Sequence, residues 1–289
     1  MQILLNGIIV GGIYALIALG FNLIFSSTRF FHVLYGVLAL LGAYFTYTFM
    51  EYGWNFFAAI PVAALLASLL GVASWQFLYK PLVDRKASSL VLMVTSFGAL
   101  IVVQNLIALI WKNNTKSISI TDTIKPAYEF LGLNITFNQL VILAVSIVLM
   151  VLLELFLKKT KYGLAIRAIG DNAELTTVLG LHTNRITLLV FFIGTFLSAV
   201  SASLIALEIG ARPTHGLHYF FLKAVIASII GGIGSMRGAL IGGLLLGVVE
   251  NIGIYYLGGS WQEVVAFSLL TLFLLFKPQG LVNQMQLAK

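Results

Sequence analysis

The chain contains no cysteine and little charge. None of its 289 residues is Cys, which excludes disulfides, thiolate metal sites and thiol nucleophiles. Only 9% of the residues are charged, whereas 60% are hydrophobic. A soluble domain carries about 25% charged residues, because water must solvate its surface. The composition therefore predicts a protein whose outer surface lies in lipid.

Uncharged stretches of membrane-spanning length follow one another along the chain. Crossing a hydrocarbon layer of about 30 Å takes roughly 20 helical residues. Six stretches of this length contain no Asp, Glu, Lys or Arg: 1–28, 30–50, 52–79, 87–111, 130–153 and 186–207. The remaining C-terminal part is apolar with scattered charges, and the glycine-rich turn at 231–238 divides it into two shorter helices, followed by one at 263–276. We predict an all-α transmembrane helix bundle of eight or nine spans that forms one domain, 1–289.

Positive charge is divided unevenly between the two sides of this bundle. Counted by alternating loops, twelve basic residues fall on one side: Arg29, Lys80, Arg85, Lys86, Lys158, Lys159, Lys161, Arg167, Arg185, Arg237, Lys277 and Lys289. Five fall on the other side: Lys112, Lys116, Lys125, Arg212 and Lys223. Cytoplasmic loops carry the excess of Lys and Arg, so we expect the first side and the C-terminus to be cytoplasmic and, with nine spans, the N-terminus external. Orientation in a membrane thus explains the net charge of +7 without a nucleic-acid partner.

The cytoplasmic segment 158–187 is too long for a turn and contains a helix pattern. Asp171 can cap a helix with Glu174 as its reciprocal partner, an apolar edge begins at Leu175, and Gly180 can end the helix. A helix that lies on lipid usually carries Lys and Arg on its polar face, and this one carries none. The pattern therefore favours a docking helix for a cytoplasmic partner protein over a membrane-surface helix.

Several polar residues fall inside the predicted spans, where ionisable groups are costly. Glu250 lies in the middle of a late span, so it either forms a structural hydrogen bond or borders a translocation path. The same two alternatives hold for four amides: Asn22, Gln104, Asn105 and Asn251. Glu208 and Lys223 flank an external loop and are expected to reach the membrane interface.

Enzymatic chemistry is not indicated by the polar residues. The cluster from Gly231 to Gly238 lacks the spacing of a phosphate-binding loop and its Lys-Ser/Thr ending. Ser235 follows a glycine, but no histidine is placed deep in a late span to activate it. We therefore expect neither catalysis nor a nucleotide site in this chain, and no cofactor bound to it.

Several motifs together carry a family resemblance. The opening spans contain Asn6–Gly7, Tyr14–Ala18, Gly20 and Gly42–Tyr44, and the cytoplasmic segment contains Gly163, Arg167–Ala168, Asn172 and Gly180–Leu181. The C-terminal part contains Pro213, Gly216, Lys223–Ala224, Gly231–Ser235, Gly238–Ala239, Gly242–Gly243, Gly247, Glu250 and Pro278–Leu281. In these motifs the chain resembles the integral membrane permease subunits of bacterial branched-chain amino acid ABC importers.

The resemblance implies a permease half in the bacterial inner membrane. Such a subunit pairs with a second, related permease, so we expect a heterodimer rather than a homodimer. It receives a branched-chain amino acid from an extracytoplasmic binding protein, and two cytoplasmic ABC ATPases, which bind the ATP, drive it. The residues implied in ATPase coupling are Arg167, Ala168, Asp171, Asn172, Glu174, Leu175 and Gly180.

Two departures from the family pattern affect the expected function. The run His32–Val37 keeps only Gly36 of the family's usual Asn-Phe-Ala-His-Gly-Glu-like sequence, and Thr176 replaces an alanine. Since a broken helix at the first of these sites could border the path, His32 joins the candidate path residues, and the substrate stays open. The alternatives are a related ABC permease for urea or short amides and a secondary transporter that couples ions through Glu250 or Glu208.

Overall fold

The structure, a computed structural model, describes residues 1–120, 128–130, 133–171 and 182–282 and is almost entirely helical. The first half contains α1 (Gln2–Thr28), α2 (Tyr35–Glu51), α3 (Phe56–Ala73), the π-helical turn η1 (Ser74–Tyr79), α4 (Lys80–Asp84) and α5 (Ser89–Trp111). An antiparallel hairpin of β1 (Tyr128–Phe130) and β2 (Leu133–Ile135) precedes α6 (Phe137–Lys159) and α7 (Lys161–Asp171). The last part contains α9 (Thr183–Ile209), the π-helical turn η2 (Gly216–Phe221), α10 (Leu222–Gly231), α11 (Met236–Leu257), the 3₁₀ turn η3 (Gly259–Trp261) and α12 (Gln262–Phe276).

The described residues form seven helical segments long and apolar enough to cross a membrane. They are α1, the continuous segment α3–η1–α4, α5, α6, α9, α11 and η3–α12. Two shorter apolar segments, α2 with 17 residues and η2–α10 at Gly216–Gly231, lie between them in sequence. The predicted polytopic helix bundle is confirmed, as is the division of the C-terminal part into two helices, α10 and α11.

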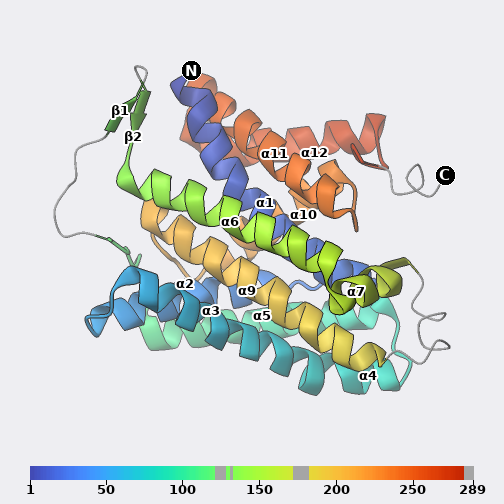
Figure 1. Cartoon of the computed structure of the whole chain (residues 1–289). Helices are drawn as coiled ribbons and strands as arrows, with labels where there is room; N and C mark the ends of the chain where they lie inside the picture. Colours follow the sequence, from blue (N-terminus) through green and yellow to red (C-terminus); the bar gives the residue numbers. More distant parts are fainter. Residues whose placement is uncertain (121–127, 131–132, 172–181, 283–289) are drawn as a thin grey trace.

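Helix α1 lies at the centre of the bundle. In Figure 1 it runs from the N-terminus beside α11 to the neighbourhood of α7, and it also packs on α9 and α10. Of its most apolar 18-residue stretch 83% is buried, against 22% for α5 and 6% for η3–α12. The outer helices therefore present their apolar side chains to lipid or to another subunit, as a low-charge composition requires.

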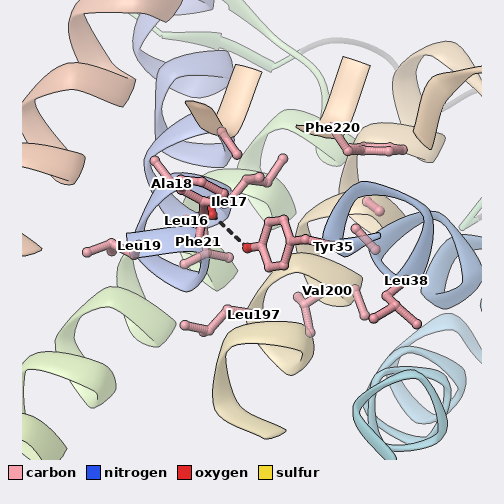
Figure 2. Packing of buried hydrophobic residues seen from close by; sticks show 14 of the residues in the cluster. Leu16, Ile17, Ala18, Leu19, Phe21, Tyr35, Leu38, Leu197, Val200 and Phe220 are labelled. Carbon is pink, nitrogen blue, oxygen red and sulfur yellow. Dashed lines mark hydrogen bonds between the residues drawn. The ribbon is translucent and has the colours of Figure 1, made fainter. Parts of the chain in front are cut away.

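The core joins helices from distant parts of the sequence, as Figure 2 shows around Tyr35. The Tyr35 hydroxyl of α2 donates a hydrogen bond of 2.7 Å to the Ile17 carbonyl of α1. Leu197 and Val200 of α9 and Phe220 of η2 lie around the ring, and all of these side chains are buried. The bond satisfies a polar hydroxyl that would otherwise be costly inside the bundle.

Lys80 and Lys116, which the sequence assigns to different sides, lie at opposite ends of the bundle. Lys80 lines a cleft with Thr28, Ile169 and Thr183, so α1, α4, α7 and α9 meet there. At the opposite end, Lys116 and Ala211 exchange backbone hydrogen bonds of 2.9 and 2.8 Å.

The segment after α9 turns back into the bundle and is interrupted. From Ala211, which pairs with Lys116 at one end, the chain reaches Gly216, which packs on Gly36 near the start of α2. A Cβ atom on Gly36 would overlap the Gly216 carbonyl and lie 2.7 Å from the Phe221 Cβ. The glycine retained in the His32–Val37 run is thus required by this close approach. The short η2–α10 segment is a broken helix packed within the bundle.

Candidate functional site

An ion pair lies buried between α10 and α11. The Lys223 ammonium donates a hydrogen bond to Oε1 of Glu250 and forms a salt bridge with it. The Lys223 residue is 3% exposed and Glu250 is 0% exposed. An ionised group in hydrocarbon is costly unless it is paired. Each of these charges therefore offsets the cost of burying the other.

Hydrogen-bond donors and aromatic rings complete this polar cluster, which consists of Tyr14, Tyr219, Lys223, Glu250 and Gln262. The Tyr14 hydroxyl and the Gln262 amide donate to Oε2 of Glu250 at 2.9 and 3.1 Å. The hydroxyls of Tyr14 and Tyr219 lie 3.0 Å apart. The Lys223 ammonium lies 5.7 Å from the centre of the Tyr14 ring and 5.9 Å from that of Tyr219, within reach of a cation–π attraction. The polar cluster therefore ties α1, η2, α10, α11 and α12 together.

The expectation that Lys223 reaches the membrane interface is wrong. Loop parity places it beside the external loop, but its side chain lies inside the bundle on Glu250. The sequence signal for this contact was that Lys223 and Glu250 both belong to the C-terminal motif of the family. Tyr14 belongs to the motif of the first span, whereas Gln262 belongs to no motif. Sequence reasoning did not single out these partners of Glu250.

The candidate path amides make other contacts. Asn22 uses both ends of its amide: Nδ2 donates to the Ser235 carbonyl at 3.0 Å, and Oδ1 accepts from the Gly234 N–H at 3.3 Å. It fastens the turn between α10 and α11 to α1. Asn105 and Asn251 donate to carbonyls one turn earlier in their own helices, at 2.7 and 3.0 Å, and Gln104 is half-buried on α5. The structure brings none of these amides to Glu250.

His32 forms a second buried network, between α1 and α2. Its Nδ1 lies 2.9 Å from the Tyr79 hydroxyl, which donates to Ser96 Oγ at 3.0 Å. Ser96 Oγ in turn accepts from the Leu34 N–H at 2.9 Å. Among the described residues, nothing hydrogen-bonds the buried Nε2 of His32. The network holds the break between the first two helices against η1 and α5.

The coupling candidates fall partly on α7. Arg167 is exposed and Ala168 half-buried on this helix, and Asp171 is its last residue. Asn172, Glu174, Leu175 and Gly180 lie outside the described residues, as does the predicted helix after Asp171. The helix α7 itself, which begins at Lys161, was not predicted.

Helix α7 is amphipathic and held against the bundle. Ile166 and Ile169 on its inner face are 2% and 3% exposed, and the Arg29 guanidinium donates to the Gly170 carbonyl. Leu164 on the opposite face is 62% exposed, and Tyr162 in the first turn of the helix is 63% exposed. The helix thus presents an aromatic and an aliphatic side chain at this end of the bundle.

The sequence matches a family of transport proteins over almost its whole length. Residues 3–274 match the family described as the branched-chain amino acid transport system permease component. The chain belongs to this family. It is therefore a multi-pass membrane permease subunit, and the buried polar cluster lies inside a transport protein.

Two relatives resemble this permease from end to end. BraD of Pseudomonas aeruginosa, a high-affinity branched-chain amino acid transport system permease protein, is 32% identical over 305 residues, which cover 100% of this chain and 97% of BraD. LivH of Escherichia coli K12, which has the same description, is 29% identical over 303 residues, covering 100% and 97% of the two chains.

A solved structure shares the fold of this permease. PsaBC from Streptococcus pneumoniae, in complex with a Fab, aligns with a TM-score of 0.56 and 13% identity, covering 100% of this chain and 96% of the other. At this identity the likeness concerns the arrangement of the helices alone.

Proposed function

We propose that this permease forms part of the translocation path of an ATP-driven importer for branched-chain amino acids. It works in the bacterial inner membrane with its C-terminus in the cytoplasm, paired with a second, related permease subunit. An extracytoplasmic binding protein delivers the substrate, and two cytoplasmic ABC ATPases carry the nucleotide sites. The observation that carries this proposal is the family match over residues 3–274, together with the end-to-end similarity to BraD.

The exposed face of α7 supports the proposed coupling. Tyr162, Leu164 and Arg167 are exposed at the basic end of the bundle, which the positive-inside rule assigns to the cytoplasm. Exposed aromatic residues and arginines are enriched in protein interfaces. In this proposal the segment 158–187 receives the movement of the ATPases and passes it to the spans as a rigid-body shift.

The test is uptake by a reconstituted complex. Proteoliposomes that contain this permease, a second permease, both ATPases and the binding protein should accumulate radiolabelled L-leucine when ATP is supplied. A complex with an ATPase that cannot hydrolyse ATP should not. Leucine uptake without any ATPase subunit would favour an ion-coupled secondary transporter, and ATP-driven uptake of urea or acetamide in place of leucine would favour the amide permease.

The proposed topology predicts opposite labelling of two sites. Because the chain has no native cysteine, single cysteines at the exposed positions Tyr162 and Asn113 can be labelled selectively. We expect an impermeant thiol reagent to label Asn113→Cys in intact cells with a permeabilised outer membrane, and Tyr162→Cys only after the inner membrane is opened. The opposite pattern would invert the proposed orientation.

Truncating the exposed face of α7 should uncouple the ATPases. The double substitution Tyr162→Ala and Leu164→Ala removes exposed side chains only, so the permease should still insert and fold. Loss of an interface hot spot costs about 2 kcal/mol or more, which weakens ATPase binding by about 30-fold. Titration of the purified ATPase onto the permease measures this.

The control for this prediction is Glu154→Ala. It removes the exposed partner of Lys158 on α6 near the same end but leaves α7 and the rest of the segment 158–187 intact. An exposed ion pair contributes little, so ATPase binding should stay near the wild-type value. Equal losses in the control and in the double variant would argue against a specific role for α7.

A further inference from the structure

The ion pair Lys223–Glu250 spans the two arms of a helical hairpin. Helices α10 and α11 are joined by the short turn at 232–235 and pack on each other. Lys223 lies on one arm and Glu250 on the other. The π-helical turn η2 ends at Phe221, two residues before Lys223 on the chain, so the regular α-helix of this arm begins just before the ion pair. Any movement that separates the two arms at this level must separate the two charges.

Separation would leave two opposite charges without partners inside the bundle. The Tyr14 and Gln262 donors could still hydrogen-bond Glu250, but nothing in the polar cluster would neutralise either charge. A buried charge that loses its partner is strongly destabilising. The closed hairpin is therefore favoured, unless a ligand supplies one positive and one negative group at the same time.

Exposed polar side chains lie on the segment that leads to this pair. Thr214, just before η2, and His218, within η2, are both exposed and precede Lys223 on the chain. Arg212, further toward the outer end, is exposed and donates to Thr115 at 2.5 Å. Along the chain these polar residues therefore lie between the end that we propose to be external and the ion pair.

We propose that the Lys223–Glu250 pair is a binding site for the zwitterionic backbone of an α-amino acid, which replaces the internal ion pair when the hairpin opens. The substrate ammonium would bind the Glu250 carboxylate, and the substrate carboxylate would bind the Lys223 ammonium. Two charge pairs then replace one, and no charge is left unpaired. The inference rests on the proposed function and adds to it the chemical group that the membrane subunit itself recognises.

The replacement of the internal ion pair makes opening of the hairpin depend on the class of substrate. A ligand shifts a conformational equilibrium only as far as it binds one state better than the other. A zwitterion binds the open hairpin through both charges, whereas urea or a short amide carries neither. The site therefore favours amino acids over neutral amides without reading the side chain.

A charge reversal tests the proposal in the complete reconstituted complex. The double substitution Lys223→Glu and Glu250→Lys keeps an internal ion pair, so assembly and thermal stability should stay close to wild type. A bound amino acid would have to reverse its orientation, so its side chain would point the opposite way along the path. We expect ATP-driven uptake of L-leucine to fall by about 100-fold, a loss typical of a misplaced substrate.

The matched control removes an exposed charge outside the segment 158–187. Glu154→Gln on α6 changes a side chain that is more than half exposed and should leave uptake unchanged. Full leucine uptake by the Lys223/Glu250 reversal would show that the pair only fastens the hairpin and would overturn the proposal. Absence of ATP-driven leucine uptake by the wild-type complex would instead refute the proposed function itself.

A second measurement does not depend on the folding of the reversal. Leu222→Cys introduces the chain's only cysteine at a half-buried position beside Lys223. L-Leucine should slow its labelling by a water-soluble thiol reagent in the assembled complex. Leucinamide, which lacks the carboxylate, and 4-methylpentanoate, which lacks the ammonium, should not slow it at the same concentration. Equal protection by either analogue, or no protection by leucine, would overturn the proposal.

Discussion

Gly247→Leu is expected to destabilise the permease by about 3 kcal/mol, the upper end of the usual cost of overpacking, because the added side chain meets backbone atoms that cannot move aside. A Cβ atom at Gly247 would overlap the Gly11 backbone and lie 2.7 Å from the Gly7 carbonyl oxygen. Helices α1 and α11 approach this closely only because small residues face each other. The yield of monodisperse protein in detergent and its thermal unfolding measure the effect.

The control for this substitution is Gly98→Leu on α5. No heavy atom lies within 4 Å of a Cβ atom built there, and the position is exposed. Because glycine costs about 0.5–1 kcal/mol in a helix interior, this change should leave stability equal or slightly higher. If both leucine variants unfold alike, the close contact between α1 and α11 does not determine stability.

Glu250→Leu is expected to cost about 3–5 kcal/mol, as does breaking a buried ion pair from one side. The substitution leaves the Lys223 ammonium buried against the rings of Tyr14 and Tyr219 without a counter-charge. Glu250→Gln, which keeps a hydrogen-bonding group opposite Tyr14 and Gln262, should lose less. Equilibrium unfolding of the detergent-solubilised protein measures the free energy lost by each of the two variants.

The double variant Lys223→Met with Glu250→Leu distinguishes the cost of an unpaired charge from the cost of altered packing. Replacing both members of a buried pair by apolar residues is often neutral for stability, so most of the loss should be recovered. If Glu250→Leu alone costs only about 0.6 kcal/mol, the value typical of a hydrogen bond between membrane helices, then the residue contributes as a hydrogen-bonding group rather than as a charge.

Three parts of the polar cluster come from distant points of the chain. Glu250 and Lys223 are separated by 27 positions and Glu250 and Tyr14 by 236, yet α1 packs on both α10 and α11. Gly243 and Gly247 of the C-terminal motif meet Ala15 and Gly11 of α1 at this interface. The small size of these residues allows the close approach of α1 and α11 that brings Tyr14 to Glu250.

The last part of the C-terminal motif also contacts a helix that precedes it by many residues in the sequence. The Leu281 N–H donates to the Ile230 carbonyl and the Val282 N–H to the Gly231 carbonyl, at 2.9 and 3.0 Å. The Pro278–Leu281 turn therefore closes the end of α10. Asn22 fastens the turn that follows α10 to α1. Asn22, a candidate path residue, and the Pro278–Leu281 motif therefore hold the C-terminal end of α10 and the turn after it in place.

The sequence by itself determined that this protein is a multi-pass helical membrane protein, where its long spans lie, and to which family it belongs. These properties follow from sums over consecutive residues, such as hydropathy and charge, and from motifs that persist in order along the chain. The tertiary structure alone decided that Lys223 turns inward to Glu250, that Asn22 binds a turn, and that α7 seats against α1. Such contacts depend on how helices pack across large sequence separations, and a local pattern carries no information about which polar group another helix will place opposite.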